Sequence, residues 1–123
     1  MELKFYICEH CGNIVAKVKD AGVPVVCCGQ KMKEIVPGTT DASVEKHVPV
    51  YTLEDNILNV QVGEIIHPME EDHYIECIIY EYKNGYDIVR LNPGNEPKAK
   101  FTYKGSGVLY EYCNKHGLWK KEL

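Results

Sequence analysis

Several absences narrow what this 123-residue sequence can encode. No apolar run approaches the roughly 20 residues that cross a bilayer, and the opening Met-Glu-Leu-Lys-Phe-Tyr lacks the apolar segment of a secretory signal. No basic block occurs, and 14 basic against 18 acidic residues give a net charge of −4. We therefore expect neither a membrane nor a nucleic acid as a partner.

Helical periodicity is also nearly absent, and alternation of apolar and polar residues recurs in its place. Apolar side chains alternate over 58–62, and Ala99, Phe101 and Tyr103 share one face of the run 98–103. A longer strand is predicted over 74–82, with Ile75, Cys77 and Ile79 facing inward. Turn signals separate these runs at Asn84-Gly85, Asn92-Pro93-Gly94 and Gly105-Ser106-Gly107. Short strands at this spacing indicate an all-β fold, an antiparallel sandwich or barrel.

A small, polar segment divides the chain. Residues 37–43, Pro-Gly-Thr-Thr-Asp-Ala-Ser, have no apolar periodicity and are predicted to be a linker between domains at 1–36 and 44–123. A domain shorter than about 40 residues usually needs disulfides, a metal or oligomerisation to fold. We therefore expect something other than an apolar core to hold residues 1–36 together.

The N-terminal cysteines supply such a device. Cys8, Cys11, Cys27 and Cys28 form a C-x2-C pair followed by a CC pair, and four thiolates satisfy a tetrahedral zinc or iron ion. Clustered cysteines in a reducing compartment indicate metal ligands before disulfides. The spacing leaves zinc and iron open, with a Cys27–Cys28 disulfide as the alternative. His10, inside the first pair, is predicted to be a surface residue.

Five further candidate ligands lie beyond the predicted linker: His47, His67, His73, Cys113 and His116. Each alone is more often a structural residue, but one thiolate beside several imidazoles indicates a redox metal. A blue-copper site needs fewer histidines and a downstream methionine, and no methionine follows His116, so iron is favoured. Cys77 is predicted to be a buried strand residue, because cysteine is often a small core hydrophobe.

Three segments together resemble the desulfoferrodoxins, the two-iron class of superoxide reductase. The matching residues are Tyr6–Val15 with Cys27-Cys28-Gly29, Glu45–Pro49, and His67–Glu76 with Cys113–Gly117. The resemblance implies a desulforedoxin-like domain whose four cysteines hold one iron. It also implies a neelaredoxin-like, immunoglobulin-like β-sandwich that holds a second iron. In that site His47, His67, His73 and His116 would form a square plane, Cys113 would be the axial ligand, and the opposite position would stay open.

The resemblance also implies an activity, the one-electron reduction of superoxide to hydrogen peroxide. Lys46, next to a ligand, can extend a positive field toward the anion, and similarity to the family suggests that it positions water or the peroxide. The same similarity suggests that Glu45 occupies the vacant position in the ferric resting state. An external donor such as rubredoxin, a homodimer, and the cytoplasm of an anaerobe or microaerophile are expected. The alternatives are a cupredoxin-like electron carrier with a structural zinc knuckle and a non-catalytic metal-binding module.

Overall fold

The computed structural model describes residues 3–40 and 42–123. Met1 and Glu2, in the predicted first domain, and Asp41, in the predicted linker, lie outside the described residues. The chain forms two compact units, Met1–Val36 and Pro37–Leu123. No helix in the described ranges is long and apolar enough to cross a membrane.

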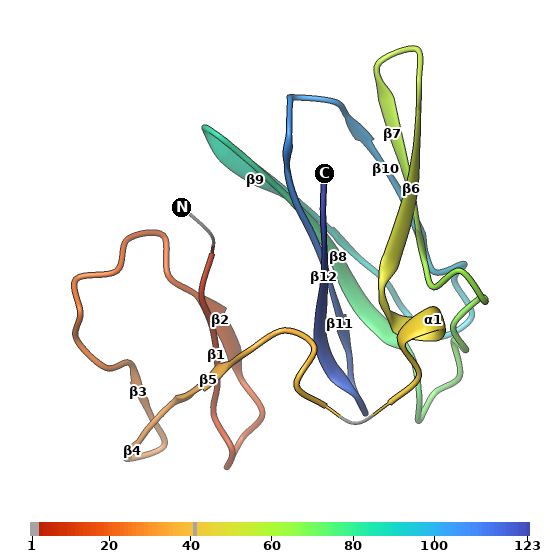
Figure 1. Cartoon of the computed structure of the whole chain (residues 1–123). Coiled ribbons are helices and arrows are strands. Elements are labelled where there is room, and N and C mark those ends of the chain that lie inside the picture. The colour runs from red at the N-terminus through yellow and green to blue at the C-terminus, as the bar shows by residue number, and fades with distance from the viewer. Residues whose placement is uncertain (1–2, 41) are drawn as a thin grey trace. The chain divides into compact units, whose positions relative to one another are not determined.

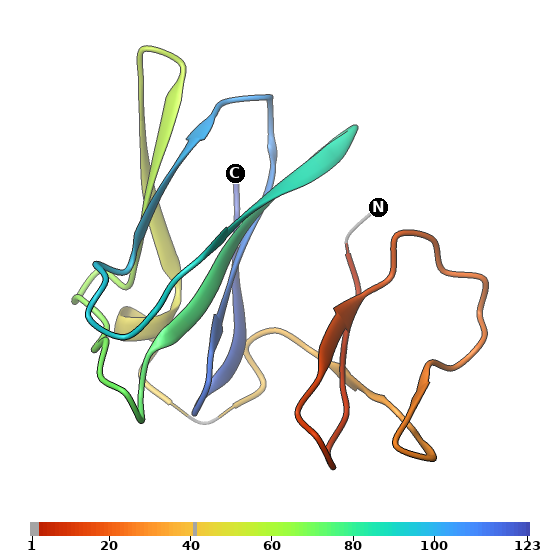
Figure 2. The same cartoon turned by 180° about the vertical axis from the view of Figure 1, so that it is seen from behind.

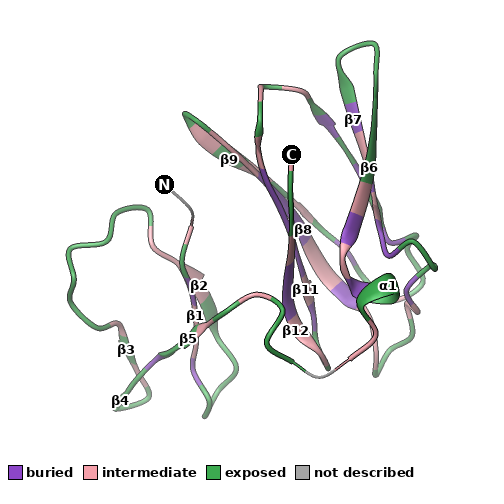
Figure 3. Ribbon diagram, viewed as in Figure 1, coloured by how far each residue is buried: buried purple, intermediate pink, exposed green. Residues whose placement is uncertain are grey.

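The first unit consists of short strands with little apolar burial. A three-stranded sheet has the order β2-β1-β5, and β3 pairs with β4 in a separate ribbon. The strands are β1 (Phe5–Ile7), β2 (Ile14–Ala16), β3 (Val26–Cys27), β4 (Gln30–Lys31) and β5 (Lys33–Ile35). Only Phe5, Cys8 and Met32 are buried hydrophobic residues among those described here, and most of the ribbon is exposed in Figure 3. So small a core cannot offset the loss of chain entropy, and cross-links through the cysteines are needed.

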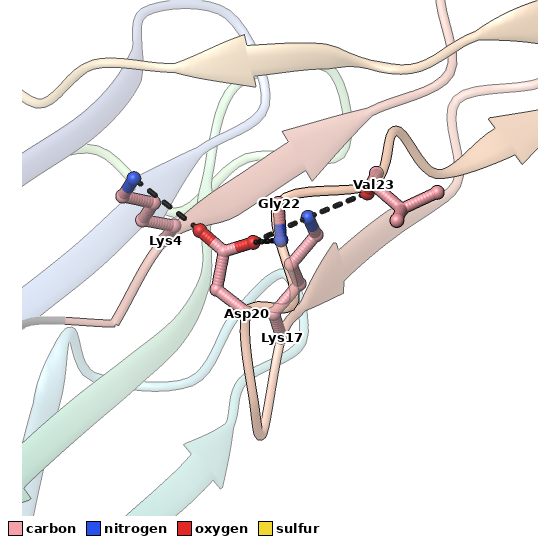
Figure 4. Close-up of polar contacts among 5 residues, drawn as sticks. All are labelled: Lys4, Lys17, Asp20, Gly22 and Val23. Carbon is pink, nitrogen blue, oxygen red and sulfur yellow. Dashed lines mark hydrogen bonds and ion pairs between the residues drawn. The ribbon is translucent and has the colours of Figure 1, made fainter.

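A polar network orders the loop between β2 and β3 (Figure 4). The carboxylate of Asp20 accepts hydrogen bonds from Lys17 Nζ and from the Gly22 backbone N–H, both at 2.9 Å. Lys4 Nζ approaches the same carboxylate at 3.4 Å, and Lys17 also donates to the Val23 carbonyl at 2.8 Å. These bonds lower the pKa of the Asp20 carboxyl to about 2, and the bond from Lys17 has the largest effect. The network replaces part of the order that a larger core would provide.

The second unit is an antiparallel β-sandwich (Figures 1 and 2). One sheet has the strand order β10-β7-β6 and the other β12-β11-β8-β9. A single helical turn, α1 (Val44–His47), precedes the first of these strands. The strands are β6 (Pro49–Glu54), β7 (Ile57–Val62), β8 (Ile75–Tyr82), β9 (Gly85–Arg90), β10 (Lys98–Thr102), β11 (Gly107–Cys113) and β12 (Gly117–Glu122). The predicted all-β class, with a small N-terminal metal-binding domain, is confirmed.

The facing surfaces of the two sheets form the core. Alternate residues of β7 and β10 point inward, as their alternating sequences predict: Leu58, Val60 and Val62 on β7, and Ala99 and Phe101 on β10. The opposing sheet contributes residues from three of its elements, Ile75, Ile78, Tyr80, Leu91, Leu109 and Cys113. Cys113 therefore ends its strand inside the core, with no exposed surface.

The predicted inward face of β8 is wrong from Cys77 onward. Pairing with β11 skips one residue of β8, Glu76, and this irregularity is a β-bulge. A bulge shifts the alternation of side chains by one position. Ile78 and Tyr80 consequently join the core cluster between the sheets. Cys77 and Ile79 lie outside that cluster, although Ile79 is also buried. Cys77, predicted to be buried, is only partly buried.

One end of the sandwich gathers the elements that carry the candidate ligands. Helix α1, the start of β8 and the turn between β11 and β12 lie at the same end in both views (Figures 1 and 2). The turn is tight because Cys113 pairs directly with Gly117, whose φ of +79° suits glycine. The architecture therefore places histidines distant in sequence beside Cys113.

Candidate metal centres

The first unit brings its four cysteines together. The sulfur atoms of Cys8, Cys11, Cys27 and Cys28 all lie within 4.8 Å of one another. Backbone bonds shape the first pair: Cys8 N–H donates to the Asn13 carbonyl, and Gly12 N–H donates to the Cys8 carbonyl, both at 2.8 Å. Gly12, at φ +85°, allows the chain to reverse there.

These thiols are free, and their geometry suits a shared cation. Cys27 and Cys28 have their sulfur atoms 3.9 Å apart, almost twice the roughly 2.05 Å of a disulfide bond, so the vicinal disulfide is not formed. The Cys11 backbone N–H, at 3.5 Å from the sulfur of Cys8, lowers the pKa of that thiol to about 6. Hydrogen bonding with the thiol of Cys11 is the largest cause, and hydrogen bonding with the thiol of Cys8 the next, that raise the pKa of the Cys28 thiol to about 12. Four thiolates held this close repel one another unless a cation binds them, so the donor set fits a tetrahedral metal.

The second unit brings together all five of the other candidates. One potential ligand atom each from His47, His67, His73, Cys113 and His116 lies within 4.8 Å of the rest. The Nε2 atom of His47 is 3.1 Å from both His67 Nε2 and His116 Nδ1. Cys113 Sγ lies 3.5 Å from His67 Nε2. His47 and His67 therefore turn their ε nitrogens toward the other donor atoms, and His116 turns its δ nitrogen toward them.

The four imidazoles follow one another around a ring. Neighbouring rings in the order His47, His67, His73, His116 stand nearly perpendicular, at 77° to 85°, with centroids 4.6–4.9 Å apart. The diagonal pair His47 and His73 is wider, at 6.4 Å and 29°. His73 Nε2 is buried and has no hydrogen-bond partner in the part of the chain described. An orphaned imidazole nitrogen inside a ring of nitrogens fits a metal bound at its centre.

Backbone carbonyls fix the orientation of two of these rings. The Nδ1–H of His47 donates to the Ser43 carbonyl at 2.7 Å, and the Nδ1–H of His67 donates to the Pro68 carbonyl at 2.6 Å. With the proton held on Nδ1, the lone pair of Nε2 is directed into the site. These rings are thus prepared to bind a metal before it arrives.

Asn114 links two of the ligand-bearing segments. Its side-chain oxygen accepts from the Tyr74 backbone N–H at 2.9 Å, and its amide donates to the Asp72 carbonyl at 3.1 Å. Its own backbone N–H donates to the Tyr74 carbonyl at 3.2 Å. The loop that carries His73 is therefore tied to the turn between Cys113 and His116.

Burial sets the protonation of the site. It lowers the pKa of His67 to about 4 and also lowers the pKa values of His47 and His73, so these rings are neutral at pH 7, the form that binds metals. Burial raises the pKa of the Cys113 thiol. A buried thiol becomes a thiolate readily when a cation binds it. The donor set, with these three neutral imidazoles, the fourth imidazole and one thiol, therefore fits a cationic metal.

Glu45 and Lys46, predicted to be catalytic, lie on α1 beside His47. Both are exposed, and neither side chain has a hydrogen bond or ion pair within the ranges 3–40 and 42–123. Burial is the largest cause that lowers the pKa of His47. The charges of His116 and His73 lower this pKa further, and so does the positive charge of Lys46. The charge of Lys46 therefore acts on a residue of the donor set. The catalytic roles of Glu45 and Lys46 stay predictions.

Sequence patterns did not identify two residues that bond to the ligand-bearing segments, Asn114 and Trp119, or the buried carboxylate of Glu111 on β11. Asn114, Trp119 and the buried Glu111 carry no metal-ligand signature, although the first belongs to the matched Cys113–Gly117 segment. Glu111 has no exposed surface and no partner for its carboxylate among the described residues, and burial raises its pKa well above the usual value. Trp119 is the only tryptophan in the sequence. This rarity is the one feature of the sequence that could have drawn attention to it.

Known proteins resemble both units. The desulfoferrodoxin family model matches residues 39–122, and the model for the desulfoferrodoxin N-terminal domain matches residues 1–35. A desulfoferrodoxin homolog from Archaeoglobus fulgidus is 47% identical over 119 residues, covering 96% of this chain and 95% of the relative. Desulfoferrodoxin from Nitratidesulfovibrio vulgaris is 45% identical over 123 residues, covering 98% and 97%. The crystal structure of the superoxide reductase from Treponema pallidum is similar at a TM-score of 0.81 and 29% identity, covering 98% of this chain and 99% of that one.

Proposed function

Because this chain belongs to the desulfoferrodoxin family, we propose that it is a superoxide reductase, an oxidoreductase that uses superoxide as its acceptor. The observation that carries the proposal is the convergence of four imidazoles and the Cys113 thiol from three separate segments of the sandwich. The full-length likeness to the superoxide reductase from Treponema pallidum supports it.

Two mononuclear iron ions fit the two donor sets, one in each. Cys8, Cys11, Cys27 and Cys28 would hold the first, and His47, His67, His73, His116 and Cys113 the second. Iron held by the second set would supply the one electron that reduces superoxide, and the uptake of two protons would give hydrogen peroxide. A single soft thiolate beside nitrogen donors is typical of such redox sites.

The residues around the second donor set are suited to attract a small anion. The whole chain carries a net charge of −4, so capture of superoxide depends on local positive charge. Lys46 and Lys115 are exposed and adjoin His47 and His116 in the chain. A focused positive field raises encounter rates by roughly 10- to 1,000-fold. Lys46 would also offer a proton donor to the bound anion, and Glu45 would occupy the position of the anion when no substrate is present.

The remaining features follow from the same proposal. The domains are residues 1–36 and 44–123, joined by a linker at 37–43, and only the second carries out the reaction with superoxide. An external electron donor, rubredoxin or a similar small protein, restores the reduced state. The chain forms a homodimer in the cytoplasm of an anaerobe or microaerophile.

The cupredoxin-like alternative is not favoured. That site uses two histidines and a cysteine with a weak axial methionine, whereas this cluster contains four histidines. Met69, the methionine nearest in sequence to a ligand, accepts a hydrogen bond from the Ile75 backbone N–H at its sulfur, at 3.3 Å.

The products of a reaction with superoxide test the proposal. The reduced, iron-loaded protein should yield one hydrogen peroxide for each superoxide consumed, without oxygen release. Dismutation would yield one peroxide for every two superoxides, with oxygen, and would contradict a reductase. Cys113→Ser serves as the control, because a hydroxyl is a much poorer anionic ligand than a thiol. That variant should lose both the reaction and the thiolate-to-iron absorption, and metal analysis alongside distinguishes iron from spectroscopically silent zinc in the four-cysteine set.

A further inference from the structure

Trp119 makes two contacts with the histidine cluster. Its indole is stacked on the imidazole of His47, with centroids 5.0 Å apart and planes 27° from parallel. Its Nε1–H donates a hydrogen bond to the His116 carbonyl at 3.0 Å. The side chain is only 4% exposed. One buried side chain therefore contacts two of the four candidate histidine ligands.

The contact with His116 compensates for a missing constraint. The rings of His47 and His67 are each fixed by a backbone carbonyl, whereas the ring of His116 has no carbonyl acceptor in the part of the chain described. His116 also lies in the three-residue turn between β11 and β12. A hydrogen bond to its carbonyl fixes the peptide from which the imidazole projects.

The contact with His47 adds a lateral constraint. The hydrogen bond from Nδ1 to Ser43 fixes one edge of that ring, and the indole face limits its rotation about the remaining axis. Because Trp119 is on β12, opposite Glu111 of β11, its position is set by the sheet rather than by a loop. Side chains on regular strands hold a site more accurately than side chains on loops.

We infer that Trp119 is a positioning residue for the metal centre of the sandwich, which holds the His47 ring and the His116 backbone in the arrangement that binds iron. The inference rests on the proposed function only in that iron occupies this site. Outer contacts to metal ligands typically change metal affinity by about 10- to 100-fold when they are removed. Trp119 provides two such contacts.

Two substitutions separate the contributions. Trp119→Phe keeps an aromatic ring against His47 but removes the N–H that bonds His116, and Trp119→Leu removes both. Tyr80→Phe is the matched control, because the Tyr80 hydroxyl also donates to a backbone carbonyl, that of Gly105, at 2.5 Å within the same sandwich. The control loses this bond and the one that the hydroxyl accepts from the Lys104 backbone N–H at 3.0 Å, and neither involves the histidines.

The measurement is an anaerobic titration of each full-length protein with Fe2+ against a competing chelator. The sandwich site is followed by its thiolate-to-iron absorption after oxidation, and unfolding of the metal-free proteins is measured in parallel. The Fe2+ dissociation constant should rise about 10- to 100-fold for Trp119→Leu and less for Trp119→Phe. Tyr80→Phe should bind as the wild type does. The absorption band should shift in both Trp119 variants and not in the control.

A purely structural role for Trp119 predicts a different pattern. In that case the metal-free variants would be less stable, but the folded proteins would bind Fe2+ with unchanged affinity and an unshifted band, and the inference would be wrong. If Trp119→Leu does not fold, the affinity and band of Trp119→Phe decide in the same way. Failure of the wild-type sandwich to bind Fe2+ would instead overturn the proposed function, and the inference with it.

Discussion

Lys17 and Asp20 show how single residues replace a core in the first unit. The side chain of Lys17 is 13% exposed and contacts both the carboxylate of Asp20 and the Val23 carbonyl. Exposed ion pairs are individually weak, but this pair closes a loop that has no strand of its own. The lowered pKa of Asp20 is the measurable sign of that closure.

The pKa of Asp20 gives a first prediction. A carboxyl whose pKa is lowered from 3.8 to about 2 adds stability above pH 3.8 that is lost as the pH falls toward 2. Lys17→Met removes the largest cause, so the pKa should return toward 3.8. Carbon NMR shifts of the Asp20 carboxyl between about pH 3 and 5 measure the change. Lys4→Met, which removes only the 3.4 Å contact, should have a smaller effect, and equal effects would contradict the assignment.

His47 and Lys46 are adjacent in one helical turn but face opposite environments. His47 is 2% exposed within the cluster, whereas Lys46 is exposed. Because Lys46 cannot be a ligand, its removal should leave iron bound while it weakens attraction of the anion. The two residues therefore separate metal binding from substrate capture.

Lys46→Ala should slow the bimolecular reaction with superoxide by up to about 10-fold and reduce its dependence on salt. Exposed charges act over a Debye length of about 8 Å at physiological ionic strength. Stopped-flow or pulse measurements of the oxidation of the reduced centre, over a series of salt concentrations, provide the test. Lys100→Ala makes the same change in net charge on β10 and should leave both values unchanged. Identical rates and salt slopes in all three proteins would exclude steering by Lys46.

At the scale of elements, helix α1 is held in place by the chain that follows β7. Gly63 N–H donates to the Val48 carbonyl at 3.3 Å, and Ile65 N–H donates to the Glu45 carbonyl at 3.0 Å. Gly63 has a φ of +83°, and a Cβ added there would lie 2.5 Å from the Lys46 carbonyl oxygen. This glycine is therefore required both by the backbone conformation and by close contact with α1.

Gly63→Ala should displace α1 and with it His47. Overpacking typically costs about 1–3 kcal/mol, and the displacement should also reduce the iron content of the sandwich site. Denaturant unfolding and metal analysis measure the two effects. Gly105→Ala is the control, since Gly105 has a φ of +100° and open space around its Cβ position. It should lose stability through backbone strain alone and keep its iron; loss of iron from both variants would refute the specific role of Gly63.

Sequence patterns predicted the elements that depend on local order, and failed where two strands must be compared. Alternation predicted β7 and β10 with the correct inward faces, because a half-buried strand repeats every two residues. The bulge at Glu76 is visible only in the pairing of β8 with β11, so the inward face of β8 was predicted wrongly. Residue type and spacing indicated the metal donors, whereas the contacts of Trp119 join residues that no spacing rule connects.

At the scale of the whole molecule, the two donor sets belong to separate compact units. The cysteine set lies within Met1–Val36 and the histidine set within Pro37–Leu123. No residue is shared between them. Apolar burial is also distributed unequally, because the sandwich has a continuous apolar core and the first unit buries few large side chains.

This division predicts that Cys8→Ser removes the four-thiolate centre and leaves superoxide reduction largely intact. Metal binding can contribute about 10–16 kcal/mol to a small domain, far more than the few buried residues of the first unit can, so that unit should unfold locally. Cys77→Ser, at a thiol that belongs to neither donor set, is the matched control and should change neither centre. The second-order reaction of the pre-reduced variants with superoxide, together with amide exchange in the first unit, distinguishes the cases. Retained exchange protection in Cys8→Ser would mean that the first unit does not depend on its metal, and a lost reaction with superoxide would mean that the two centres are not independent.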